Sequence, residues 1–262
     1  MSCCPTESAP YLGSDYNHKG AVESLGAVEI YAAGVGCSPS MPGCCSERGL
    51  ILVPDIYGWN GGRTRNIADF YGDRGYCVVV PKILIPAMGE GTDGDACPPE
   101  YKPDASFIPF MQTFSWDGSF KPKIAACIEH LVSKGCKKIG MIGFCFGGWV
   151  VCRTIADKDI SSVVVGGCSP HPSIQLEQFA WGGDVAALCA SVDKPVLFLP
   201  AGGDSPDYDK GGKWLPPLGE SVRYPDQVHG WVPRGDLGGA ACAAAVKSAL
   251  LQMGDFLDKI CC

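Results

Sequence analysis

The sequence predicts a single-domain α/β fold with a mostly parallel central sheet and helices on both of its faces. One observation is that short, β-branched apolar runs alternate with amphipathic stretches along the chain, which is typical of a parallel sheet covered by helices. Another is that 262 residues, 46% of them hydrophobic and 19% charged, are enough to bury one large core. No repeat or interdomain linker interrupts this order. We therefore expect one domain at residues 21–262, preceded by an irregular N-terminal segment at residues 1–20.

The expected strands are the apolar runs that are bounded by Gly or Pro residues. They cover residues 28–32, 50–54, 77–80, 139–143, 162–166, 196–200 and 221–224. Apolar residues at helical spacing predict the helices between them. These helices cover residues 63–74, 121–134, 146–156 and 240–260. Gly75 and Gly135 stand where the first two helices would end.

Three stretches do not fit the alternation. Residues 33–49 lie between two early strands and are expected to be an ordinary surface excursion. Residues 85–117 and 202–220 are rich in Gly, Pro and Asp, which predicts two long surface loops. Loops of this size are uncommon unless they form lids or binding walls. Since both are expected beside the carboxyl edge of the sheet, they are candidates for the walls of a functional site.

Charge and apolar patterning argue against nucleic-acid and membrane partners. The chain has 28 acidic and 21 basic residues and a net charge of −7, without the basic stripe that phosphate backbones demand. Its longest convincing uncharged apolar run, at residues 139–152, has 14 residues, against the roughly 20 needed to cross a bilayer. No secretory leader is visible at the N-terminus, and the 16 cysteines include no C-x-x-C pair. We expect a soluble, cytoplasmic protein with mostly reduced thiols.

Residues 139–148, with the sequence IGMIGFCFGG, carry the strongest local signal. An apolar strand enters G-x-C-x-G-G and then a helix, which is the pattern of a nucleophile elbow, a strained turn that small residues allow. The turn would lift Cys145 above the sheet at a helix N-terminus, where a thiolate is favoured. The N–H of Phe146 would face a developing oxyanion. The alternative is that Cys145 is one more small buried residue and that Gly143 and Gly147 serve packing alone.

A thiol nucleophile needs a base, and chain position selects one of the four histidines. In α/β-hydrolase folds the order along the chain is nucleophile, acid, histidine, with the histidine in the loop after the final strand. His229 has that place. Asp204 follows the preceding strand and would orient the imidazole, while Asp207 and Asp209 are competitors in the same loop. The sequence therefore predicts an α/β-hydrolase fold in which Cys145, His229 and Asp204 form a triad.

Further segments, taken together with this triad, resemble one family. They are Val53-Pro54-Asp55-Ile56-Tyr57-Gly58-Trp59, Thr64-Arg65-Asn66-Ile67-Ala68-Asp69 and Gly75-Tyr76, followed by the Cys145 elbow, Asp204 and His229-Gly230. By the order of these motifs, roughly residues 20 to 260 resemble the dienelactone hydrolase family, including its eukaryotic carboxymethylenebutenolidase-like members. The resemblance implies hydrolysis of the ester bond of a small lactone or carboxylic ester, with no metal and no organic cofactor.

The resemblance also implies a role for each matching position. Cys145 would be the nucleophile that forms a thioester intermediate, His229 the base and acid, and Asp204 the acid that orients the histidine. Backbone N–H groups of Ile56 and Phe146 would form the oxyanion hole.

Substrate recognition is where the chain departs from the family pattern. In bacterial relatives a glutamate contacts the resting thiol and takes part in its activation, and Asp55 stands at that position here, with a turn-capping role as the alternative. Those relatives hold the substrate carboxylate with two arginines, and Arg234 resembles one of them. The other has no counterpart, because no arginine lies between Arg74 and Arg153.

Other residues are expected around the pocket. His171, in its His-Pro-Ser setting, resembles another branch of the family in which the motif ends a strand near the pocket; a structural loop histidine is the alternative. Tyr57 and Trp231 are expected in the pocket wall. We expect the protein to be a monomer whose binding partner is a small ester or lactone.

Two other functions are open to the same fold. One is binding or redox sensing through Cys145 without turnover, and the other is acyl transfer to an acceptor other than water.

Overall fold

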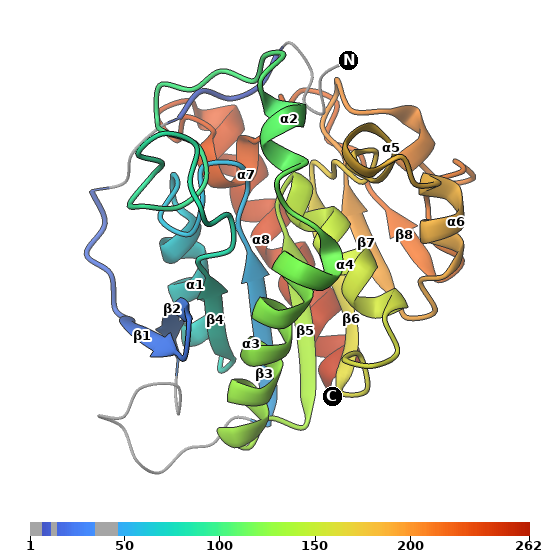
Figure 1. Ribbon diagram of the computed structural model, residues 1–262. Coiled ribbons are helices and arrows are strands. Elements are labelled where there is room, and N and C mark those ends of the chain that lie inside the picture. Colours follow the sequence, from blue (N-terminus) through green and yellow to red (C-terminus); the bar gives the residue numbers. More distant parts are fainter. Residues whose placement is uncertain (1–6, 12–14, 35–46) are drawn as a thin grey trace.

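The computed structural model of the chain describes residues 7–11, 15–34 and 47–262. Residues 1–6, 12–14 and 35–46 lie outside this description, and with them parts of the segment expected at residues 1–20 and of the excursion expected at residues 33–49. Within the described residues one eight-stranded sheet is flanked by helices on both faces (Figure 1). The predicted α/β-hydrolase fold is confirmed.

The strands follow the order β1-β2-β4-β3-β5-β6-β7-β8 across the sheet. Their bounds are β1 Ala21–Leu25, β2 Val28–Ala33, β3 Arg48–Val53, β4 Cys77–Pro81, β5 Lys138–Gly143, β6 Val164–Pro170, β7 Val196–Leu199 and β8 Gly219–Ser221. The pairs β1–β2 and β2–β4 are antiparallel, and the pairs from β4 to β8 are parallel. Because the parallel strands run the same way, their carboxyl ends meet at one edge of the sheet.

Three strands differ from the sequence expectation. β1 was not expected because this edge strand is largely exposed and lacks an apolar run. β6 continues to Pro170 through Gly166 and Gly167, which the sequence suggests as a stop. A Cβ on Gly167 would lie 2.9 Å from the carbonyl oxygen of Met141 on β5, so this glycine allows two strands to approach closely and does not end one. β8 ends at Ser221, and Tyr224 makes only an isolated bridge to Ala201.

All four predicted helices are present: α1 Thr64–Asp73, α3 Lys121–Ser133, α4 Phe146–Ala156 and α8 Ala240–Cys261. The sequence did not predict the shorter helices. Two lie within the expected loops, α2 Phe107–Met111 and the 3-10 helix η2 Pro206–Tyr208, and the π-helix η1 Trp116–Phe120 begins at the end of one. The others lie in stretches with no predicted element, namely α5 Leu176–Trp181, α6 Val185–Ala190 and α7 Trp231–Arg234. They span too few residues to show a helical period in the sequence. Helices α3 and α4 share the core on one face of the sheet, and α1 and α8 share the core on the other (Figure 1).

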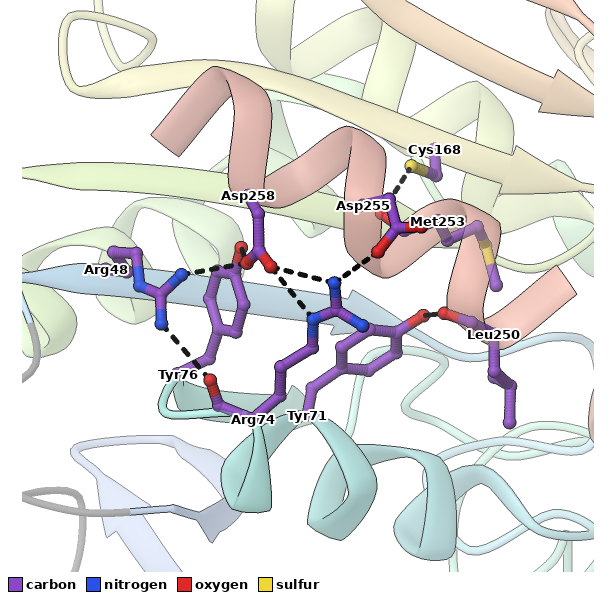
Figure 2. A network of polar contacts seen from close by, with 9 residues as sticks. All are labelled: Arg48, Tyr71, Arg74, Tyr76, Cys168, Leu250, Met253, Asp255 and Asp258. Atoms are coloured by element: carbon purple, nitrogen blue, oxygen red, sulfur yellow. Dashed lines mark hydrogen bonds and ion pairs between the residues drawn. The ribbon is translucent and has the colours of Figure 1, made fainter. Parts of the chain in front are cut away.

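A polar network fixes α8 against the opposite end of the sheet from the carboxyl edge. Asp258 accepts hydrogen bonds from Arg48 Nη1 at 2.8 Å, Arg74 Nε at 3.0 Å and the Tyr76 hydroxyl at 2.7 Å. Figure 2 shows these three side chains converging on one carboxylate from two parts of the chain. Burial alone would raise the pKa of Asp258, but the bonds from Arg74 and Tyr76 lower it below its usual range.

Ten cysteines of the described residues are free thiols, in line with the expected mostly reduced state, whereas Cys77 is disulfide-bonded. Sequence spacing gave no sign of this bond, because it is not a C-x-x-C pair. No helix in the described part of the chain is both long and apolar enough to cross a membrane. The cytoplasmic location and the monomeric state stay predictions.

Candidate functional site

Four neighbouring strands bring the candidate residues to the carboxyl edge of the sheet. Val53 at the end of β3 pairs with Gly143 at the end of β5, and β6 and β7 continue the parallel register beside them. Asp55, Cys145 and His171 follow β3, β5 and β6 within two residues, and Asp204 follows β7. Residues far apart in the sequence therefore come together because the strands are parallel and adjacent.

The turn after β5 has the geometry of a nucleophile elbow. Cys145 has φ 54° and ψ −117° and stands directly before α4, a backbone conformation that costs energy for any residue with a side chain. A Cβ on Gly143 would lie 2.0 Å from the carbonyl oxygen of Gly147, and one on Gly147 would lie 2.7 Å from that of Val53. The two glycines are thus required by close backbone crossings. The Cys145 side chain is fully buried.

His229 and Asp204 form a tight, buried pair. Nδ1 of His229 lies 2.7 Å from Oδ1 of Asp204, and the other carboxylate oxygen accepts a 2.7 Å hydrogen bond from the N–H of Ala201. The competitors point elsewhere: Asp209 pairs with Arg223, and Asp207 with Lys213. Of the three acids considered, Asp204 is therefore the one placed to orient the imidazole.

The pKa of His229 reports the charges around it. Burial lowers this pKa, but the opposing contributions of Asp204 and then Cys145 are larger and raise it to about 10. Cys145 thus acts on His229 from close by, through charge and hydrogen bonding. Nε2 makes no hydrogen bond of ordinary geometry within the described residues, so its contact with the thiol is looser than the bond on Nδ1. The imidazole is held by Asp204 on one side and free to exchange a proton on the other.

Asp55 and Arg234 are joined in a buried ion pair. Nε of Arg234 donates to Oδ2 of Asp55 over 2.7 Å, and Oδ1 of Asp55 accepts a 3.0 Å hydrogen bond from the N–H of Tyr57. The guanidinium lies 4.7 Å from the centre of the Tyr57 ring and also donates to the carbonyl of Ala9. Burial lowers the pKa of Arg234, but the charge and the hydrogen bond of Asp55, together with smaller contributions of Tyr57 and Cys145, outweigh burial and raise this pKa. Holding a substrate carboxylate stays a prediction for Arg234, whose Nε is engaged by Asp55.

The predicted oxyanion-hole residues lie on two adjacent turns. Ile56 follows β3, and Phe146 opens α4; both are buried. The turns touch, since the N–H of Phe144 donates to the carbonyl of Val53 over 3.0 Å, and a Cβ on Gly147 would lie 3.2 Å from the carbonyl of Pro54. The structure thus places both residues beside Cys145 at the same edge of the sheet.

His171 packs directly against the catalytic candidates. It is fully buried, has φ 41°, stacks on Phe144 with ring centres 6.0 Å apart, and meets His229 edge-on at 4.9 Å. Burial, followed by the charge of His229, lowers its pKa well below the usual value, so the ring is neutral. Neither ring nitrogen has a hydrogen-bond partner among the described residues.

The two predicted wall residues have different surroundings. Tyr57 lies next to Tyr11, with ring centres 5.4 Å apart, and its hydroxyl donates to the carbonyl of Tyr101 over 2.6 Å. Trp231 is fully buried on the face of the sheet that α1 and α8 cover and packs against Tyr224. Tyr57 is therefore beside the Asp55–Arg234 pair, while a pocket role for Trp231 stays a prediction.

Two contacts of the site were not anticipated. Oγ of Ser173 lies 3.3 Å from Sγ of Cys145, and the N–H of Ala9 donates to the carbonyl of His229 over 2.7 Å. Ser173 follows His171 by two residues, so the His-Pro-Ser motif was a signal that could have been extended to it. Nothing in the sequence around Ala9 indicates a contact with a residue 220 positions away. Among the described residues, no three His, Cys, Asp or Glu side chains are grouped as metal ligands would be.

Comparison with known proteins supports the assignment made from motifs. The model of the dienelactone hydrolase family matches residues 33–261. The chain belongs to the dienelactone hydrolase family. It is therefore a hydrolase of the class that acts on ester and lactone substrates.

Individual relatives are distant. The chain is 25% identical to the hydrolase tropI of Talaromyces stipitatus over 99% of its own length and 98% of that protein. It is 30% identical to the Homo sapiens carboxymethylenebutenolidase homolog over 105 residues, a stretch that covers 40% of this chain and 39% of the homolog. In fold it resembles a Klebsiella pneumoniae protein assigned to the dienelactone hydrolases, with a TM-score of 0.62, 15% identity and coverage of 92% and 99% of the two chains. A Saccharomyces cerevisiae monoglyceride lipase has a TM-score of 0.56 at 11% identity and coverage of 96% and 97%.

Proposed function

We propose that this member of the family cleaves the ester bond of a small lactone or carboxylic ester with Cys145 as the nucleophile. The observation that carries the proposal is the buried His229–Asp204 pair beside a cysteine held in a strained elbow. A cysteine that only filled the core would need neither an oriented histidine nor a costly backbone. Asp204 fixes the imidazole through Nδ1, which leaves Nε2 as the atom that exchanges protons with Cys145 and the substrate.

The reaction proceeds in two displacements. His229 takes the thiol proton of Cys145, and the sulfur attacks the carbonyl carbon to give an oxyanion held by the N–H groups of Ile56 and Phe146. The carbon–oxygen bond of the ester breaks, the alcohol leaves with the proton from His229, and a thioester remains on Cys145. His229 then takes a proton from water, whose oxygen attacks the thioester. The acid leaves and the thiol is restored, so that one water is consumed for each ester bond.

The remaining predicted residues act around these atoms. The positive charge of Arg234 interacts with Cys145, and we place Arg234 and Asp55 as the pair that supports the thiolate. For a substrate carboxylate, Arg234 has the N–H groups that Asp55 does not use. Tyr57 supplies the aromatic wall next to that pair. His171, neutral and without a partner among the described residues, offers a ring nitrogen to the substrate.

The experiment is hydrolysis of p-nitrophenyl acetate by the full chain, Cys145→Ala and a matched control, Cys152→Ala. Cys152 is buried in α4, seven residues along the chain from Cys145. We expect Cys145→Ala to lose turnover on the order of 10³-fold or more and Cys152→Ala to stay close to wild type. Turnover that survives in Cys145→Ala would refute the proposal. Labelling of Cys145 by iodoacetamide without any hydrolysis would instead indicate a binding or redox-sensing protein, and transfer to an added alcohol in place of water would indicate an acyltransferase.

A further inference from the structure

Ser173 contacts Cys145 through both its side chain and its backbone. Its hydroxyl lies 3.3 Å from the sulfur of Cys145, and its backbone N–H donates to the carbonyl of Cys145 over 3.0 Å. Both side chains are fully buried. A hydroxyl at this distance can exchange a hydrogen bond with sulfur. Once the sulfur is a thiolate, only the hydroxyl can donate.

The position of Ser173 is fixed by its neighbours and not by the contact itself. A Cβ on Gly148 in the first turn of α4 would lie 2.2 Å from Oγ of Ser169 and 3.4 Å from Cβ of Pro172. The absence of that Cβ lets the segment sit directly on the helix. On the other side, the Tyr208 hydroxyl accepts a 2.9 Å hydrogen bond from the N–H of Ile174. The segment is therefore held on both sides with the hydroxyl of Ser173 aimed at the sulfur.

The other groups around the sulfur differ from Ser173 in charge. Both carboxylate oxygens of Asp55 are engaged, one by Arg234 and one by the N–H of Tyr57. Among the groups that interact electrostatically with Cys145 are His229, His171, Arg234 and Cys97. His229 and Arg234 act on the sulfur as charged groups, whereas His171 is neutral. A neutral hydroxyl adds a hydrogen bond to the thiolate without adding a charge, and such bonds to ionised groups are strong in a buried site.

We propose that Ser173 is a further catalytic residue, whose hydroxyl donates a hydrogen bond to the Cys145 thiolate and keeps it populated near neutral pH. This inference rests on the proposed function, because it requires Cys145 to be the nucleophile. The hydroxyl stabilises the thiolate before attack. After attack the sulfur is part of a thioester and is a weaker acceptor, so the hydroxyl no longer holds it.

This role has a signature that a purely structural serine would not produce. Removing a hydrogen bond to a charged group is expected to move the pH midpoint of Cys145 alkylation upward by about one pH unit. At a pH below the midpoint, the variant then has about one tenth of the thiolate of wild type. A more basic thiolate is more nucleophilic, with a Brønsted coefficient of about 0.4–0.5, so each thiolate of the variant reacts roughly threefold faster. The variant is therefore about threefold slower at low pH and about threefold faster at high pH, and the two pH profiles cross.

The test measures the rate of Cys145 carbamidomethylation by iodoacetamide between pH 5 and 10, with peptide mass mapping, in the wild-type chain and in Ser173→Ala. Ser173→Gly removes the same hydroxyl and serves if the alanine variant does not fold. Ser169→Ala is the matched control, because its equally buried hydroxyl donates to the carbonyl of Gly143 and not to sulfur. Crossing profiles in the Ser173 variants, with an unmoved midpoint in Ser169→Ala, would support the inference.

Two further outcomes have separate meanings. Superimposable profiles of wild type and the Ser173 variants would overturn the role of Ser173 and leave Cys145 as nucleophile. Full ester hydrolysis by Cys145→Ala, measured in the same series, would overturn the proposed function and with it the role of Ser173.

Discussion

Replacing Arg234 by methionine is expected to destabilise the fold strongly, because it leaves a buried charge without its partner. The exposed fractions of the Arg234 and Asp55 side chains are 2% and 0%, and the two atoms that join them lie 2.7 Å apart. Breaking a buried pair by removing one partner typically costs about 3–5 kcal/mol of unfolding free energy. The variant also loses the donor to the carbonyl of Ala9 and the stacking on Tyr57, so we expect the upper half of this range.

A second variant separates the ion pair from mere packing. In the double variant Arg234→Met/Asp55→Asn the buried side chain carries no charge, so it should recover part of the unfolding free energy that Arg234→Met loses. If the loss came from a cavity or another packing defect, removing the charge of Asp55 would recover none of it.

Urea unfolding followed by circular dichroism at neutral pH measures both effects. Lys158→Met is the control, because it breaks an ion pair with Asp193 whose side chains are 60% and 59% exposed, and exposed pairs contribute little. Its unfolding free energy should stay close to wild type. If Arg234→Met were as stable as this control, or if Asp55→Asn recovered no unfolding free energy in it, the buried pair would not have the contribution to stability assigned to it here.

Three further predictions concern the site and its supports. The folded state raises the pKa of His229 from 6.5 to about 10. The protonated imidazole therefore stabilises the fold fully below pH 6.5, and this contribution is lost as the pH rises through 10. Wild type should lose more unfolding free energy over this range than His229→Gln. Gly143→Ala should prevent soluble folding, since its Cβ would meet backbone at 2.0 Å, whereas Gly239→Ala, with its nearest atom at 3.6 Å, should express as wild type. Tyr208→Phe should cost about 1–3 kcal/mol in urea unfolding, because the buried N–H of Ile174 loses its acceptor; an unchanged midpoint would contradict this.

The sequence was most informative where chemistry and chain geometry coincide. The elbow could be predicted because a strained turn demands Gly143 and Gly147 at fixed offsets from Cys145. The loop that holds Asp204 and the position of His229 could be predicted because each follows a strand of a parallel sheet, and parallel strands place their carboxyl ends together. Each signal lies in a short stretch of sequence, and the fold alone brings these stretches together in space.

The contacts that the sequence did not reveal depend on packing between distant segments. Asp55 and Arg234 were both singled out, but as separate contacts to thiol and substrate; their mutual pairing across 179 positions emerges only from the folded chain. The hydroxyl of Ser173 reaches Cys145 because Gly148 lets the segment after β6 sit on α4. Short helices such as α5 and the length of β6 were missed because six residues show no period and because paired glycines look like a strand end.

Capture of the acyl-enzyme would show directly whether Cys145 is the nucleophile. Wild-type chain is mixed with excess p-nitrophenyl acetate, quenched in acid within milliseconds to seconds, digested and mapped by mass spectrometry. We expect an acetyl group on the peptide that contains Cys145, removable by hydroxylamine and formed as fast as the first p-nitrophenol is released. Turnover that continues with an unmodified Cys145, or an acetyl group that accumulates on another side chain at the catalytic rate, would contradict it.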